Sequence, residues 1–96
     1  MEYTGKQKAR LRALANNEPI MFQIGQNGLT QNVVNNIFDY LRKHEVGRVS
    51  VLKSSPDTID EIKAALEELG IYVVYTIGKV LLLYKENKNL KDRIRL

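Results

Sequence analysis

The sequence contains no cysteine, only one histidine and no apolar run long enough to cross a bilayer. Without cysteine, neither a disulfide framework nor a thiolate metal site is possible, which is compatible with a reducing cytoplasm. The first residues, with Glu2 and Lys6 among them, do not resemble a signal peptide. Because 96 residues suffice for one small domain, we expect a single cytoplasmic domain over residues 1–96, with no membrane segment.

Patterns typical of enzymes are also missing. The lone histidine, His44, stands beside Glu45 at an expected helix end, where such a residue usually interacts with the helix dipole. The acidic residues match no calcium-loop spacing and are better explained as a solvated helix face: Asp57, Asp60, Glu61, Glu67 and Glu68. Since we find no nucleophile–base pair and no metal triad, we expect no catalysis, no metal, no cofactor and no small-molecule substrate.

Negative charge is scarce in most of the chain. Five acids and one lysine fall between Pro56 and Gly70, a net −4 within a chain total of +4, so the rest of the chain carries +8. Segregated positive charge on a small surface favours a polyanionic partner. Mild basicity also arises by chance in small soluble proteins, so composition alone does not decide between the two interpretations.

The apolar pattern predicts an α/β fold with the element order αβαβαββ. The expected helices and strands are Gly5 to about Ala15, Ile20–Ile24, a helix capped by Thr30 and stopped by Gly47, Arg48–Leu52, a helix capped by Thr58, Ile71–Ile77 and Val80–Tyr84. Right-handed crossovers place the second and third helices on one face of a four-stranded mixed sheet, which gives a two-layer sandwich. Gly78 and Lys79 fit a two-residue type II′ hairpin between the last two strands.

Apolar spacing also predicts which side chains of the later elements are buried. In the third helix the expected core face consists of Ile62, Ala65, Leu66 and Leu69. In the strand that follows, alternation places Tyr72 and Tyr75 on opposite faces of the sheet. We therefore expect one of these tyrosines in the core, while the other can be exposed.

The stretch "FQIGQNGLT" joins a strand directly to a helix and carries two glycines three positions apart, Gly25 and Gly28. The start of a helix exposes unpaired backbone N–H groups and partial positive charge, and glycine lets a phosphate approach them closely. A pair of this form clamps the nucleic-acid backbone in KH domains. Taken alone, the spacing is more typical of a tight turn than of a phosphate clamp. The third glycine of a dinucleotide fingerprint and the ending of a P-loop are missing.

The expected first helix carries four basic residues and no acid. Lys6 and Arg10 lie one turn apart along one edge of its apolar side, and Lys8 and Arg12 along the other edge. A solvated surface would normally include acids, but none occurs between Tyr3 and Asn17. Rows of this kind suit phosphate contacts, which are weak singly and large in sum.

Four landmarks in order, "KQKARLRALA", "IGQNGLT", "HEVGRVSV" and "IGKVLLLYK", resemble the YhbY/CRM family from about Lys6 to Lys85. These are small RNA-binding domains associated with bacterial ribosome maturation and plant organelle splicing. The resemblance implies a fold similar to the C-terminal domain of translation initiation factor three and a GxxG loop that contacts RNA. The RNA-binding residues expected here are Lys6, Lys8, Arg10, Arg12, Gly25, Gln26, Asn27, Gly28, Leu29, Thr30 and Lys79. Many members have a basic residue inside the loop, so the neutral Gln26 and Asn27 predict weaker binding by the loop.

The resemblance further implies that the RNA partner is ribosomal RNA or its precursor during large-subunit assembly. We expect a monomer, with a basic tail over residues 86–96. The alternative function is a protein-interaction module that docks on a ribosomal or other protein through its tyrosines, Tyr3, Tyr40, Tyr72, Tyr75 and Tyr84. An exposed tyrosine can equally stack on an RNA base, and docking through RNA and protein together is also compatible with the sequence.

Overall fold

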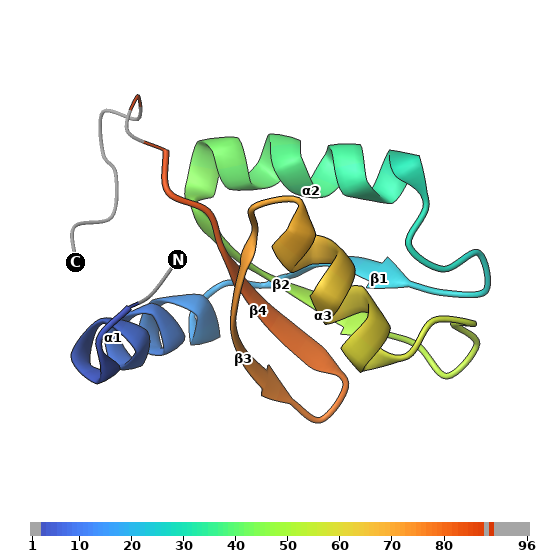
Figure 1. The fold of residues 1–96 in the computed structure, drawn as a ribbon, viewed down its shortest axis with the longest axis horizontal. Coiled ribbons are helices and arrows are strands. Elements are labelled where there is room, and N and C mark those ends of the chain that lie inside the picture. Colours follow the sequence, from blue (N-terminus) through green and yellow to red (C-terminus); the bar gives the residue numbers. More distant parts are fainter. Residues whose placement is uncertain (1–2, 88, 90–96) are drawn as a thin grey trace.

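The computed structural model describes residues 3–87 and 89 (Figure 1). Its elements follow the predicted order: α1 (Gly5–Asn16), β1 (Ile20–Ile24), α2 (Gln31–His44), β2 (Val46–Val51), α3 (Ile59–Glu68), β3 (Tyr72–Ile77) and β4 (Val80–Tyr84). Each helix begins after a threonine, Thr4, Thr30 or Thr58, whose hydroxyl accepts the backbone N–H three residues further on. None of the helices within the described ranges is long and apolar enough to span a membrane.

The four strands form one mixed sheet in the order β1-β2-β4-β3. β1 runs parallel to β2, while β4 is antiparallel to both β2 and β3. Gly78 has a φ of 58°, and Glu45 is the one described non-glycine residue with a positive φ, so Lys79 has a negative φ. This combination agrees with the predicted type II′ turn between β3 and β4.

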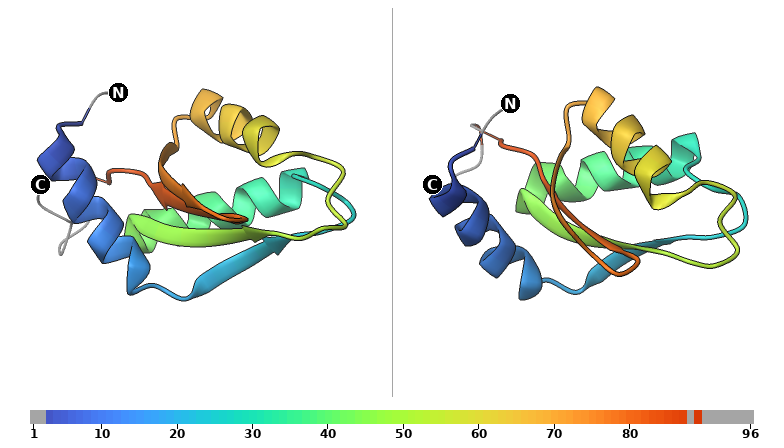
Figure 2. Two further views of the ribbon diagram at one scale, coloured as in Figure 1. Left: turned by 90° about the horizontal axis from the view of Figure 1, so that it is seen from below. Right: turned by 60° about the horizontal axis from the view of Figure 1, so that its bottom comes forward.

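Two hydrophobic cores lie on opposite faces of the sheet. The larger one joins α2 and α3 to the sheet through residues such as Ile37, Leu66 and Leu81. The smaller one lies under α1 and contains Leu11, Ala15, Val46, Leu82 and Tyr84. The predicted α/β fold with its four-stranded mixed sheet is thus confirmed, with α2 and α3 together on one face. α1 adds partial cover to the other face, at one end of the sheet (Figures 1 and 2).

The prediction that Gly47 stops α2 is wrong. The helix ends at His44, and Glu45 takes the positive φ of 65° that glycine was expected to supply. The Glu45 side chain is buried and accepts the backbone N–H of Asn87 at 2.9 Å, which fixes this residue in place. Gly47 instead lies inside β2, where a Cβ atom would stand 2.6 Å from the sulfur of Met21.

Two predictions about buried side chains fail for local reasons. The expected core residue Leu69 follows the end of α3 as its C-cap and is 44% exposed. Tyr72 and Tyr75 share one face of the sheet, because an irregularity between Val73 and Tyr75 adds a residue to β3 there. The two tyrosines consequently pair with Tyr84 and Leu82, which both belong to the smaller core.

The predicted tail at 86–96 falls largely outside the described residues. Within the described part, Asn87 also donates its side-chain amide to the backbone oxygen of Arg42 at 2.7 Å, and the Lys85 N–H bonds to the Glu45 oxygen at 2.8 Å. The chain that follows β4 therefore runs against the end of α2 as far as Asn87.

Candidate nucleic-acid interface

The two glycines between β1 and α2 bracket a hydrogen-bonded turn. The N–H of Gly28 donates to the oxygen of Gly25 at 2.9 Å, which leaves Gln26 and Asn27 at the exposed tip. Among residues 3–87 and 89, no acceptor lies within hydrogen-bonding distance of four backbone N–H groups in this region, those of Gln26, Asn27, Gln31 and Asn32. Such open donors beside a helix N-terminus are the groups that bind anions.

Gly28 is required by the fold itself. Its φ is 67°, a conformation that side chains rarely adopt, and a Cβ atom here would collide with the carboxylate of Asp57 and stand 3.3 Å from Pro56. That carboxylate accepts the backbone N–H of Leu29 at 3.0 Å and so ties the loop to the chain between β2 and α3. The fold alone therefore explains why residue 28 is glycine, without any bound ligand.

Gly25 lacks such a reason. Its φ is not positive, and a Cβ atom would make only ordinary contacts, at 3.6 Å to Leu52 and 3.7 Å to Ser54. Glycine lowers stability relative to alanine where its conformational freedom is not used. Neither the backbone conformation nor the neighbouring side chains therefore require a glycine at position 25.

Leu29 and Thr30, also predicted to contact RNA, use their polar groups internally. The Leu29 N–H is taken by Asp57, the Thr30 N–H donates to Gly28 at 3.1 Å, and the Thr30 hydroxyl accepts the N–H of Val33. Their role in RNA binding remains a prediction. At the tip of the turn, the open donors are the N–H groups of Gln26 and Asn27.

Lys79 lies at the same end of the sheet as the glycine loop. Its backbone oxygen accepts the N–H of Val51, and the next residue, Leu52, donates its N–H to Ile24 at the end of β1. Both bonds are 2.8 Å long. The β3–β4 hairpin and the glycine loop are therefore brought to one end of the sheet, with the exposed Lys53 in the chain that follows β2.

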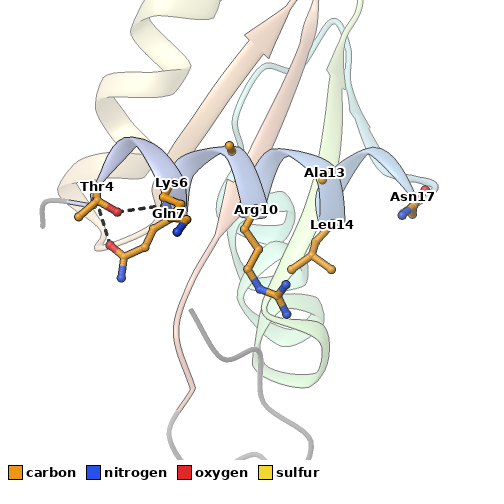
Figure 3. A pocket seen from close by; sticks show the side chains of 8 residues that line it. Thr4, Lys6, Gln7, Arg10, Ala13, Leu14 and Asn17 are labelled. Atoms are coloured by element: carbon orange, nitrogen blue, oxygen red, sulfur yellow. Dashed lines mark hydrogen bonds between the residues drawn. The ribbon is translucent and has the colours of Figure 1, made fainter.

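The four basic residues of α1 all have exposed side chains and divide between two edges of the helix, as the helical period predicts. On one edge, Lys6, Gln7, Arg10 and Leu14 help to line a hollow along α1 (Figure 3). On the other edge the Arg12 guanidinium lies over the ring of Tyr75, with 3.8 Å from its central carbon to the ring centroid. Only this second edge faces the exposed part of the sheet.

The basic helix and the glycine loop do not form one compact site. Figure 1 places α1 and the loop towards opposite ends of the long dimension of the molecule, which is 36 Å. The β3–β4 hairpin lies between them, and α1 does not extend over the strand ends that lead to the loop (Figure 2). An RNA that contacts both regions must therefore run along the sheet.

Sequence reasoning missed Asp57, which was assigned to a solvated acidic face. Asp57 precedes α3 and is half-buried, whereas the other acids of this segment are exposed. The Ser55 hydroxyl accepts the Asp57 N–H and holds the turn in which the carboxylate sits. Only the fold shows that this turn meets the loop before α2.

His44 ends α2, and its ring stacks on Tyr40 with 4.2 Å between centroids. Burial and the nearby carboxylate of Glu18, which accepts the Tyr40 hydroxyl at 3.2 Å, raise the pKa of Tyr40. Across the described ranges, 3–87 and 89, we find no cluster of three or more His, Asp or Glu side chains arranged to hold a metal ion.

Comparison with known proteins supports the predicted resemblance. The sequence profile of the CRS1/YhbY (CRM) domain matches residues 3–85 of this chain. The chain therefore belongs to the CRS1/YhbY (CRM) family.

Two curated relatives are similar over nearly their whole length. One, from Bacillus subtilis and named "Probable RNA-binding protein YqeI", is 37% identical over 90 residues, which cover 93% of this chain and 94% of that protein. Another, from Haemophilus influenzae and named "RNA-binding protein", is 34% identical over 90 residues, which cover 93% of this chain and 91% of that protein. The Staphylococcus aureus protein SAV1595 has a solution structure and is 35% identical in sequence to this chain. The two structures superpose with a TM-score of 0.71, and the match covers 97% of this chain and 98% of the other.

Proposed function

We propose that this protein is a non-catalytic, cytoplasmic RNA-binding protein that binds ribosomal RNA or its precursor during large-subunit assembly. The proposed contacts are the backbone of the glycine loop, the basic residues of α1, and Lys79. Relatives named as RNA-binding proteins support RNA as the class of ligand. The ribosomal target comes from the family resemblance alone.

One observation carries the role of the loop: Gly25 is a glycine that the fold does not need. A Cβ atom there would make only ordinary contacts, with Leu52 at 3.6 Å and Ser54 at 3.7 Å, and the φ of Gly25 is not positive, so neither a clash nor the backbone conformation requires glycine at this position. The free N–H groups of Gln26 and Asn27 stand directly beside it. A phosphate placed against Gly25 would accept hydrogen bonds from these donors without a side chain in the way.

The distribution of charge supports RNA binding on the α1 side of the sheet. The acids of α3 lie on the opposite face, because α3 packs in the larger core together with α2. The exposed cations Lys8, Arg12 and Lys79 lie on the α1 side or at the hairpin. Phosphate contacts of this kind give affinity that falls steeply with salt.

The loop is tested by substituting Gln26 and Asn27 together by aspartate. Both glycines and the turn remain, while two negative charges stand where the phosphate is expected. Like-charge repulsion should lower RNA affinity by roughly tenfold to hundredfold, about 1–3 kcal/mol. Stability should change little, because acids near a helix N-terminus are favourable by roughly 0.3–1 kcal/mol.

The matched control is the amide-preserving exchange of the same two positions, Gln26→Asn with Asn27→Gln. It should bind as the parent does, since no charge is added. Filter binding and thermal melting on the same preparations separate the two interpretations of the loop. A double-aspartate protein that melts normally and binds RNA like the parent would reduce the glycine loop to a turn.

A further inference from the structure

The face of the sheet that carries α1 has an uncovered strip next to the helix, formed by Tyr75, Ile77 and Val80, which we name the β3 strip. Tyr75 is 38% exposed and Ile77 45% exposed, while Val80 is half-buried. They share this face because Tyr75 pairs with Leu82, which belongs to the core under α1, and Ile77 pairs with Val80, which packs against that core. Neighbouring exposed apolar side chains on one face of a sheet are typical of an interaction surface.

The Arg12 guanidinium fixes the ring at one end of this strip. With 3.8 Å between its central carbon and the Tyr75 centroid, it lies in contact with the ring. A guanidinium stacked on an aromatic face is held by cation–π attraction and presents a second flat surface of its own. The pair therefore offers planar groups and positive charge in one place, next to a ring that is still partly exposed.

The charges around the β3 strip indicate the chemistry of its occupant. Lys8 lies on the same edge of α1 as Arg12, and Lys79 follows Ile77 by two residues in the hairpin. The acidic helix α3 packs on the opposite face of the sheet. An aromatic and apolar strip flanked by cations matches a nucleotide, whose base stacks through its flat aromatic face and whose phosphates are negative.

We propose that the β3 strip binds an unpaired RNA base, stacked on the exposed part of the Tyr75 ring beside Arg12, with its flanking phosphates next to Arg12 and Lys79. This inference rests on the proposed RNA-binding function and deepens it, because it names single-stranded RNA as the ligand. Bases in a duplex are stacked on one another and present no free face to a side chain.

The test compares two RNAs, an unpaired 12-nucleotide strand and the fully paired duplex of the same length. Tyr75→Ile removes the ring and keeps an apolar residue suited to a strand. It should lower affinity for the unpaired strand about tenfold and leave affinity for the duplex unchanged. Tyr75→Phe, the matched control, keeps the ring and should bind both RNAs like the parent.

Arg12→Lys separates stacking from charge. Lysine keeps the positive charge but lacks the planar guanidinium. Affinity for the unpaired strand should fall several-fold, while the dependence of affinity on salt stays the same. An unchanged affinity for the unpaired strand in both Tyr75→Ile and Arg12→Lys would overturn the inference.

A crosslinking measurement on the unaltered protein guards against variants that fail to fold. RNA containing 4-thiouridine should crosslink to the β3 peptide that contains Tyr75, and crosslinks confined to other peptides would overturn the inference. If the parent dimerises and Tyr75→Ile abolishes the dimer with RNA affinity unchanged, the strip is a protein interface and the inference is wrong. A parent that binds neither RNA overturns the proposed function itself, whereas RNA binding insensitive to Tyr75 overturns only this inference.

Discussion

The α1 end and the loop end of the molecule contribute different parts of the candidate interface. α1 carries four exposed cations on a regular helix, and no special backbone geometry is involved. The loop between β1 and α2 carries no charge at its tip, but its backbone leaves two N–H groups open beside a bare glycine. If the proposed function is right, the helix attracts any polyanion, whereas the loop binds a phosphate at one position only.

The same contrast recurs inside the loop. The positive φ and the neighbouring Asp57 require a glycine at position 28. Neither requirement applies to Gly25. If this division is correct, changes at Gly28 act on folding and changes at Gly25 act on binding.

The largest effect is expected from Gly28→Ala. Alanine at a φ of 67° costs roughly 1–2 kcal/mol, and displacing Asp57 from the Leu29 N–H costs about another 1–3 kcal/mol. The free energy of unfolding should therefore fall by about 2–5 kcal/mol, as measured by denaturant unfolding. Gly28→Asn serves as the control, because asparagine tolerates this φ better and should lose less. A Gly28→Ala protein as stable as the parent would mean that Asp57 does not require the glycine.

Sequence reasoning recovered the elements because their signals are local. The caps at Thr4, Thr30 and Thr58 and the hairpin glycine, Gly78, lie next to the structure they specify. It failed at Glu45, because a buried contact with Asn87, 42 positions away, stabilises a conformation expected of glycine. The face of Tyr75 was missed because one extra residue in a strand reverses all later side chains.

For the candidate site, sequence patterns identified the residues of the glycine loop and of the basic helix but not how far apart the two regions lie. The loop and the basic helix were both predicted, yet nothing local in the sequence places them towards opposite ends of a 36 Å molecule. The different roles of Gly25 and Gly28 also depend on Asp57, which comes from another part of the chain. Tertiary packing alone decides these features.

The α1 end is tested by Lys8→Gln combined with Arg12→Gln. Two phosphate contacts should be lost, so affinity at low salt should fall roughly tenfold and the slope of log affinity against log salt should flatten by about 1.4–1.8. Filter binding over a salt series measures both quantities. The matched control, Lys43→Gln with Lys63→Gln, removes the same charge from exposed positions on α2 and α3. Equal effects of the two pairs would show that only net charge matters.

Gly25→Ala tests the loop end without adding charge. The new methyl group contacts Leu52 and Ser54 at ordinary distances, so stability should be unchanged or rise by about 0.4–1 kcal/mol. RNA affinity should fall about fivefold, which corresponds to one impaired hydrogen bond of roughly 1 kcal/mol. Gly5→Ala at the start of α1, where a Cβ meets nothing within 4 Å, is the control and should bind normally. Undiminished binding by Gly25→Ala would remove the main argument for phosphate approach.

The smallest effect, and one of opposite sign, is expected from Asp57→Asn. The amide oxygen can still accept the Leu29 N–H, but the negative charge beside the loop is removed. RNA affinity should rise about two- to threefold because less repulsion opposes the phosphate. Stability should fall by about 0.5–1 kcal/mol, since a charge-assisted hydrogen bond becomes a neutral one. Glu68→Gln removes the same charge from the exposed last residue of α3, at the other end of the helix from Asp57, and titration of both variants against one RNA gives the comparison. A larger gain in affinity from Asp57→Asn than from Glu68→Gln would support a phosphate at the loop, whereas equal gains would leave only the general effect of net charge.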